Sequence, residues 1–261
     1  MFRALNIAAT GMAAQETNLE AISHNIANGN TVGYKKERID FQDLLYQTVR
    51  QAGTPTGPTT TSPTGLQIGT GVRVVSTSRM FQQGTVLQTG NQLDVAIEGS
   101  GFLVIQQNDG TPAYTRNGAL KTDGDGRIVN AEGFPLEPPI TVPPDASSVS
   151  ISANGTVSVT LPGQTTPSDI GQIQLANFVN PAGLQAVGHN LLVATRASGE
   201  PQVGEPAADG RGTLLQGAVE QSNVEIVEEM IGMISAQRAY EINSKVITTA
   251  DEMLRAASQM K

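Results

Sequence analysis

The sequence has 261 residues, of which 38% are hydrophobic and 4% aromatic, with 28 glycines, 14 prolines and no cysteine or tryptophan. The lack of cysteine excludes disulfide frameworks, thiolate metal sites and cysteine nucleophiles, and a net charge of −8 with scattered basic residues argues against nucleic-acid binding. So few large side chains offer little to anchor a compact monomeric core, which suits a protein stabilised partly by its neighbours.

Neither a membrane span nor a cleavable secretory signal is expected. No apolar run approaches the ~18 residues that a membrane helix needs. In the first 21 residues Asn6, Thr10, Gln15 and Glu16 interrupt any apolar core of a signal peptide. If the protein leaves the cytoplasm, we expect another route.

The first segment has the period of a helix whose apolar residues repeat at alternating steps of three and four, as in a coiled coil. Asn28 and Gly29 then end the pattern. Gly11 in the middle predicts a helix that is weak alone and orders when it packs. The repeating row is Leu5, Ala8, Met12, Gln15, Leu19, Ile22 and Ile26.

A low-complexity stretch follows at residues 51–65, where 13 of 15 residues are Thr, Pro, Gly or Ser. This composition favours a flexible linker. The alternative is a strap that orders against neighbouring subunits and makes a polymer rigid. The residues assigned to such a strap are Thr54, Pro55, Pro58 and Pro63.

From about residue 72 to residue 217 the pattern changes to short strands and turns. Residues 93–98 and 102–105 read as strands, and the turn signals at 108–110, 123–126 and 154–155 favour hairpins. No helix-length periodic segment occurs here. The middle of the chain is therefore predicted to be an all-β module.

The last segment predicts a second helix of nearly forty residues. Ser222 and Asn223 offer N-caps, and Glu225, Glu228 and Glu229 suit its first turns. Two adjoining rows give a stripe wider than one two-stranded seam needs. Such a helix either packs on its own domain or joins other copies, and its length and terminal position favour the second. One row is Ala236, Tyr240, Asn243, Ile247, Ala250, Leu254 and Ala257; the other is Ala239, Ile242, Val246, Thr249, Met253, Ala256 and Met260.

Catalytic and metal-binding patterns are weak. The sequence from Asp123 to Gly126 resembles the start of a calcium-binding loop. Phe134, however, stands where an EF-hand needs Glu, so we expect a turn. Only His24 and His189 are available as histidines, and no carboxylate pair is marked as catalytic. We expect no enzymatic activity, no metal and no cofactor.

Four ordered segments carry a family resemblance. They are NIANGNTVGYKK (25–36), LDVAIEGSGFLVI (93–105), AYTRNGALKTDGDGRIVNAEGFPL (113–136) and QRAYEINSKVITTADEML (237–254). The chain resembles the bacterial flagellar axial proteins, the family of rod and hook subunits, although Val32 and Leu120 replace the usual Pro and Phe. The residues of the first motif that match are Asn25, Ala27, Asn28, Thr31, Gly33, Tyr34 and Lys35.

The resemblance implies an α+β fold in which long terminal helices form a coiled-coil domain with an inserted all-β domain. The implied divisions are 1–35 and 219–261 for the helical core, 36–72 for the connecting segment with its extended strap, and 73–218 for the β-rich outer domain. The helical self-assembly interface would use the non-polar members of the first row, Leu5 to Ile26, together with Ala236, Tyr240, Asn243, Val246, Ile247, Ala250, Met253, Leu254 and Ala257.

Within this family, DLLYQTVRQAG (43–53), the strap and GLQIGTGV (65–72) are most similar to distal rod subunits. Such subunits form a rigid hollow shaft that transmits torque from the motor to the hook and lets exported proteins pass. The implied partners are other copies of the chain, proximal rod and hook proteins, the P-ring and L-ring, and the flagellar type III export apparatus. The implied place is the basal body, spanning the periplasm, with neither nucleic acid nor membrane insertion.

Two other functions stay open. A flexible hook-type or proximal-rod subunit of the same family would give a polymer with different mechanics. A secreted β-rich protein that binds or hydrolyses carbohydrate would instead be a folded, active monomer.

Overall fold

The computed structural model describes residues 2–55, 61–163 and 166–259. The chain divides into two compact units. The helical unit draws on residues 1–27, 37–78 and 225–261, and the β unit on residues 28–36 and 79–224. An α+β fold is thus present, with helices at the two ends of the sequence and strands between them.

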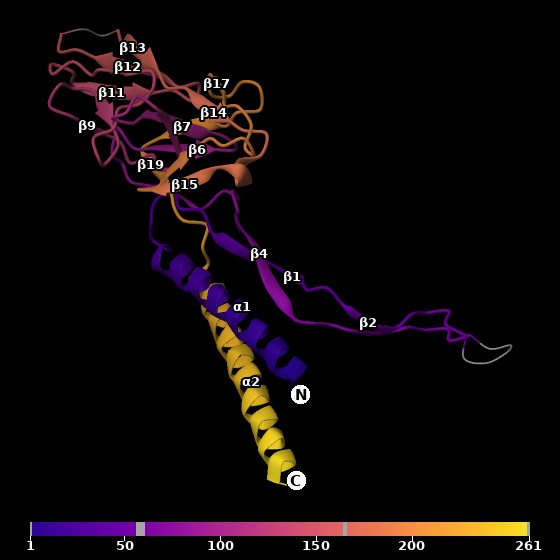
Figure 1. The fold of residues 1–261 in the computed structure, drawn as a ribbon. Helices are drawn as coiled ribbons and strands as arrows, with labels where there is room; N and C mark the ends of the chain where they lie inside the picture. The colour runs from indigo at the N-terminus through magenta and orange to yellow at the C-terminus, as the bar shows by residue number, and fades with distance from the viewer. Residues whose placement is uncertain (1, 56–60, 164–165, 260–261) are drawn as a thin grey trace. The chain divides into compact units, whose positions relative to one another are not determined.

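Two long helices dominate the helical unit: α1 spans Phe2–Ala27 and α2 spans Ile226–Gln259. They lie side by side and run in opposite directions, and the last turns of α2 extend past the start of α1 (Figure 1). The end of α1 at Ala27 confirms the stop predicted at Asn28 and Gly29.

The predicted start of α2 is two or three residues too early. The helix begins at Ile226, where the amide of Glu229 donates to the carbonyl of Glu225. The side chain of Asn223 is used in the β unit, where it accepts from the Lys36 amide and donates to the Met80 carbonyl. Ser222 accepts a bond from the Val224 amide in a local turn. Neither side chain caps the helix.

A two-stranded ribbon completes the helical unit. Strand β1 (Glu37–Asp43) pairs with β4 (Val72–Arg79), and β2 (Gln47–Arg50) pairs with β3 (Leu66–Ile68). The Leu44 amide donates to the Gly71 carbonyl at 2.9 Å and the Thr70 hydroxyl to the Leu45 carbonyl at 2.8 Å, which joins the two paired parts. Both flanks of the low-complexity stretch are therefore held in one continuous hairpin (Figure 1).

The β unit is built from fifteen short strands within its described residues. Its largest sheet is antiparallel, in the order β15-β16-β8-β7-β14-β17, and β11-β12-β13 form a second sheet. Three further pairs are β18 with β6, β19 with β5 and β10 with β9. The bounds are β5 Val86–Gln88, β6 Val95–Glu98, β7 Phe102–Gln106, β8 Pro112–Thr115, β9 Lys121–Thr122, β10 Ile128–Val129, β11 Ser148–Ile151, β12 Thr156–Thr160, β13 Ser168–Gln172, β14 Leu175–Asn177, β15 Gln185–Gly188, β16 Leu191–Val193, β17 Gln202–Gly204, β18 Thr213–Gln216 and β19 Ala218–Glu220, with a 3-10 turn at Pro181–Gly183.

The three predicted hairpin turns are confirmed. Strands β7 and β8 pair across the turn that contains Gly110. In β11 and β12 Val149 faces Val159 and Ile151 faces Val157, on either side of Gly155. The turn between β9 and β10 is closed by the Asp123 carboxylate, which accepts from the amides of Asp125 and Arg127.

Four of the ten aromatic residues lie together in the β unit. Phe81, Phe102, Tyr114 and Phe178 form a chain of edge-to-face ring contacts with centroids 4.8–5.8 Å apart. A second, larger aliphatic cluster fills the other side of the β unit, around Leu103, Ile105 and Leu175. The β unit therefore has a core of its own, and the low aromatic content did not prevent one.

Candidate assembly surfaces

The first predicted row of α2 packs against α1 of the same chain. Ala236 and Ala250 are buried, and Asn243, Ile247 and Leu254 are half-buried. On α1 the predicted row shows the same pattern: Ala8 and Ile22 are buried, and Leu5, Met12, Leu19 and Ile26 are half-buried. These two rows form the α1–α2 seam.

Small residues let the two helices approach closely. A Cβ on Gly11 would lie 2.9 Å from Asn243 Nδ2, and one on Gly232 would lie 3.6 Å from Ile22 Cδ1. Gly11, which weakens an isolated helix, is thus the residue that admits the Asn243 side chain to the seam.

Asn25, the first residue of the family motif, ties three elements of the helical unit together. Its side chain is 1% exposed. The amide nitrogen donates to the Glu37 carbonyl at 2.8 Å and to the Glu229 carboxylate at 3.2 Å, and its oxygen accepts from the Glu37 amide at 2.9 Å. Asn25 thereby fixes the end of α1 to the start of β1 and to the first turn of α2.

The second predicted row of α2 is largely exposed. Ile242 is 63% exposed and Met253 51%, and Val246 is also exposed; Tyr240 is a member of the first row that is exposed as well. More apolar residues continue this surface toward the start of the helix. We call the surface the outer stripe of α2; it comprises Val227, Met230, Ile231, Ile234, Ile242, Val246 and Met253. Ala257, the last member of the first row, is exposed too, whereas Met260 of the second row lies outside the described residues.

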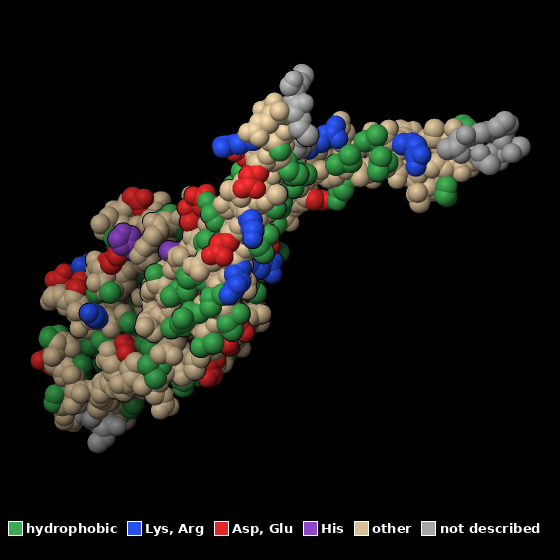
Figure 2. Space-filling view, turned by 90° about the horizontal axis from the view of Figure 1, so that it is seen from below, with side chains coloured by type: hydrophobic (Ala, Val, Ile, Leu, Met, Phe, Trp, Pro, Cys, Tyr) green, Lys and Arg blue, Asp and Glu red, His purple; other side chains and the backbone are tan. Residues whose placement is uncertain are grey.

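The ribbon carries a second exposed apolar surface. Leu45 is 91% exposed, and Tyr46, Val49 and Leu66 are each exposed by half or more. Hydrophobic side chains are visible along this narrow arm (Figure 2). A hollow of about 680 Å³ lies beside Leu45 and Tyr46.

The strap residues that the structure describes belong to the tip of this ribbon. Pro55 forms a β-bridge with Thr61, and the Ser62 amide donates to the Thr54 carbonyl at 2.9 Å. The Thr54 hydroxyl donates to the Gln51 carbonyl, and Pro63 is exposed. Pro58 lies outside the described residues. The backbone is paired where residues 53–55 meet residues 61–62, which favours the strap over a flexible linker for these residues.

Lys35, the last matched residue of the motif, belongs to a buried ion cluster in the β unit. Lys35 Nζ lies 2.6 Å from Glu220 Oε1, and Arg116 Nη1 lies 3.2 Å from Glu220 Oε2. Their side chains are 3%, 4% and 0% exposed for Lys35, Arg116 and Glu220. The Gly84 amide also donates to Glu220 Oε1 at 2.9 Å. One carboxylate therefore holds two cations and a backbone amide.

Further hydrogens of the two cations are directed at backbone carbonyls, whereas the buried Arg116 Nε has no hydrogen-bond partner among the described residues. Lys35 Nζ donates to the Gln82 carbonyl and Arg116 Nη2 to the Gly99 carbonyl, each at 2.6 Å. Burial lowers the pKa of Lys35 and of Arg116, and Glu220 opposes the shift in both. A cluster with two cations and one anion is stable only while each member keeps its partners.

The other motif residues shape a turn that docks on the same cluster. Thr31 bonds to Asn28 through both backbone and side chain. Gly33 has φ +71°, its amide donates to the Glu220 carbonyl at 2.8 Å, and a Cβ there would lie 2.6 Å from the Arg116 carbonyl carbon. Only glycine fits this contact. Tyr34 is buried, and Ala27 ends α1 as an exposed residue.

Sequence reasoning missed Glu220 and gave Arg116 no role. Arg116 stands in the YTRNG part of the third family segment, but the segment alone names no partner for it. Glu220 lies 185 residues from Lys35 and is one of 24 acidic residues. Ala218 and Val219, which precede Glu220, are apolar and form strand β19 with it. An acidic residue at the end of an apolar strand was the sequence signal that could have pointed to a buried ion pair.

Among the described residues, neither helix combines the length and the hydropathy that a bilayer crossing requires. The same residues include no group of three or more His, Asp or Glu side chains that is arranged to hold a metal ion.

Three family models match separate parts of the chain. "Flagella basal body rod protein" matches residues 5–35, "Flagellar hook protein FlgE/F/G D1 domain" matches residues 96–159, and "Flagellar basal body rod FlgEFG protein C-terminal" matches residues 215–260. The first and third cover α1 with the motif and α2, and the second covers much of the β unit.

Curated relatives match over the whole length. "Flagellar basal-body rod protein FlgG" of Buchnera aphidicola subsp. Schizaphis graminum is 49% identical over 260 residues, covering 100% of both chains. The FlgG proteins of Caulobacter vibrioides and Bacillus subtilis are 50% and 37% identical over at least 99% of both chains. This chain therefore belongs to the FlgG family of flagellar basal-body rod proteins.

Proposed function

We propose that the chain is a structural subunit of the flagellar distal rod, where it polymerises into a rigid hollow shaft that transmits torque and lets exported proteins pass. The observation that carries this proposal is the outer stripe of α2, which remains exposed although α2 already packs against α1. Exposed apolar surface of this extent marks an interaction site.

The arrangement suits an open polymer better than a closed oligomer. A surface that binds a different surface on an identical neighbour generates a helical filament when the rotation does not close. Here α1, α2 and the ribbon all present separate exposed surfaces within one unit. Coiled-coil packing of α1 and α2 from many copies would line the axis and give axial stiffness.

The first test introduces a charge into the outer stripe. Ile242→Asp should raise the critical concentration for polymerisation by about tenfold or more, because each contact would bury a carboxylate among apolar side chains. Because Ile242 is 63% exposed in the single chain, the free energy of unfolding of the dilute protein should change by no more than about 0.5 kcal/mol. Sedimentation of polymer and urea unfolding measure the two quantities.

Ser244→Asp is the matched control, an exposed position on the same helix outside the stripe. It should polymerise like the unmodified chain. Equal critical concentrations for Ile242→Asp and Ser244→Asp would contradict the assignment of this surface.

The strap is the part of the proposal that concerns rigidity. An exposed apolar ribbon that reaches neighbouring subunits would add lateral cross-links, and each cross-link reduces bending. Because Arg50 and Leu66 are paired, residues 51–65 can be replaced by an Asn-Gly turn that leaves β2 and β3 joined. The shortened chain should form filaments that bend visibly in electron micrographs, whereas the unmodified chain forms straight ones.

A control variant keeps the number of residues at 51–65 but changes Thr54, Pro55 and Pro63 to serine. Comparing its filaments with those of the shortened chain separates the effect of the strap's length from the effect of its conformation. Straight filaments from the shortened chain would contradict the strap hypothesis. Curved filaments from the unmodified chain would favour a hook-type subunit instead.

The remaining assignments follow from family membership. The relatives are named as rod proteins, which supports a place in the flagellar basal body and a structural, non-enzymatic role. We extend this to proximal rod and hook proteins at the ends of the polymer, the P-ring and L-ring around it, and delivery by the flagellar type III apparatus. The four domain divisions given above, 1–35, 36–72, 73–218 and 219–261, likewise stay predictions.

A further inference from the structure

The outer stripe of α2 is interrupted by positive charge. Arg238 and Lys245 are exposed on the same side of the helix as Ile231, Ile234 and Ile242. Within the described part of the chain, neither cation takes part in an ion pair. Glu241 lies about one helical turn from each of them but forms an ion pair with neither in the described residues. An apolar surface that contains two unpaired cations is complementary to a partner surface that is also apolar and carries two carboxylates.

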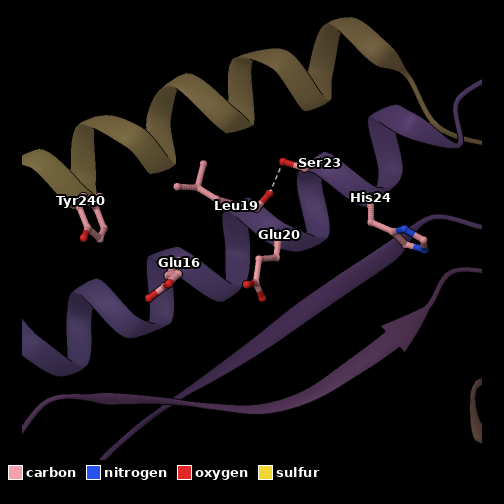
Figure 3. Close-up of a pocket in the computed structure, with 6 residues that line it drawn as sticks. All are labelled: Glu16, Leu19, Glu20, Ser23, His24 and Tyr240. Atoms are coloured by element: carbon pink, nitrogen blue, oxygen red, sulfur yellow. Dashed lines mark hydrogen bonds between the residues drawn. The ribbon is translucent and has the colours of Figure 1, made fainter.

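Such a surface is present on α1. A hollow of about 800 Å³ is lined by Glu16, Leu19, Glu20, Ser23 and His24 of α1 and by Tyr240 of α2. Leu19 and Tyr240 supply apolar surface, Glu20 points away from α2, and Tyr240 points from α2 toward α1 (Figure 3). Glu16 and Glu20 are exposed, and neither forms an ion pair within the described residues. We call this surface the acidic groove.

We propose that the acidic groove of one copy receives the outer stripe of α2 from a second copy, with Arg238 and Lys245 facing Glu20 and Glu16. This inference rests on the proposed polymerisation and specifies one contact that builds it. The occupant is a second copy because the matching surface, in apolar character and in charge, belongs to this same chain.

The spacing of the charges agrees with a shared polarity of subunits. In a polymer whose copies all point the same way, α2 of one copy runs antiparallel to α1 of the next, as it does to α1 of its own chain. Arg238 then meets Glu20 and Lys245 meets Glu16. The cations are about 10 Å apart along their helix and the carboxylates about 6 Å. The reach of the lysine and arginine side chains spans the difference.

Charge reversal on one surface at a time tests the contact. Glu16→Lys/Glu20→Lys makes both surfaces of a copy basic, and Arg238→Glu/Lys245→Glu makes both acidic. Each variant alone should show a critical concentration about tenfold or more above that of the unmodified chain, since like charges would face each other at every contact. An equimolar mixture should polymerise again, because each basic surface then meets an acidic one on the other variant.

The mixture distinguishes contacts between copies from contacts within one chain, since an internal pair cannot be repaired by a second protein. Lys121→Glu/Arg196→Glu carries the same change in net charge as Arg238→Glu/Lys245→Glu, but in the β unit, and should polymerise normally. Circular dichroism of each dilute variant verifies that α1 and α2 are intact.

Two results would overturn the inference: normal polymerisation of both reversed variants, or failure of their mixture. Failure of the unmodified chain to polymerise would instead overturn the proposed function.

Discussion

Replacing Glu220 by leucine should lower the free energy of unfolding of the β unit by about 3–5 kcal/mol, the cost of leaving buried charges without their counter-ion. Lys35 and Arg116 would keep their positions at 3% and 4% exposure with no carboxylate between them. The Gly84 amide would also lose its acceptor. A domain with a total stability of about 5–15 kcal/mol would then be close to unfolding.

Urea unfolding followed by circular dichroism measures this loss. Glu200→Leu is the control, because Glu200 is exposed and outside the cluster; it should change stability by less than about 0.5 kcal/mol. The triple variant Lys35→Met/Arg116→Leu/Glu220→Leu removes all three charges together and should be more stable than Glu220→Leu alone. If Glu220→Leu costs no more than Glu200→Leu, the cluster does not hold the β unit together.

Loss of the cluster should also free the motif segment. Residues 28–36 are fixed to β19 by the Lys35 ion pair and by the bond from the Gly33 amide to the Glu220 carbonyl. With the ion pair gone, amide hydrogen exchange in this segment should rise before exchange in the strands does. The family motif therefore contributes to both units. In the helical unit Asn25 fixes the end of α1, and in the β unit Gly33 and Lys35 fix residues 28–36 to β19.

The elements that were predictable from sequence are those set by local periodicity and turn chemistry. The row from Leu5 to Ile26 repeats within one helix, and its end at Asn28 depends on the residues next to it. The β11–β12 hairpin follows from Asn154 and Gly155 flanked by alternating valines. In each case the residues that decide the structure lie within a few positions of one another.

The features that were missed depend on contacts between distant residues. Glu220 and Lys35 are 185 residues apart, and nothing local marks their pairing. The ribbon pairs Gln47 with Ile68 across a stretch whose composition indicates a linker. The start of α2 was misplaced because Asn223 has the right type for an N-cap but bonds to Lys36 and Met80 instead. A long-range partner overrode the local preference.

Gly118→Ala should be about as damaging as the loss of Glu220, for a purely steric reason. An added Cβ would lie 1.6 Å from the Val95 carbonyl oxygen, far inside any real contact. The Val95 amide donates to the Gly118 carbonyl at 2.9 Å, so the strand start cannot retreat without losing this bond. Val95 is 1% exposed and belongs to the aliphatic core. We expect a loss of about 3 kcal/mol or more in the free energy of unfolding, which combines overpacking with a broken buried hydrogen bond.

Gly124→Ala is the matched control for this substitution. Gly124 lies in the β9–β10 turn of the same unit, and no atom lies within 4 Å of the Cβ that alanine would add. Its φ is outside the left-handed region, so alanine brings neither clash nor backbone strain. Urea unfolding should place Gly124→Ala within about 1 kcal/mol of the unmodified chain, on the stable side if the reduced freedom of the unfolded chain dominates. Equal stability of the two variants would mean that β6 can move away from Gly118, and the tight contact at Val95 would then have no part in fixing the β unit.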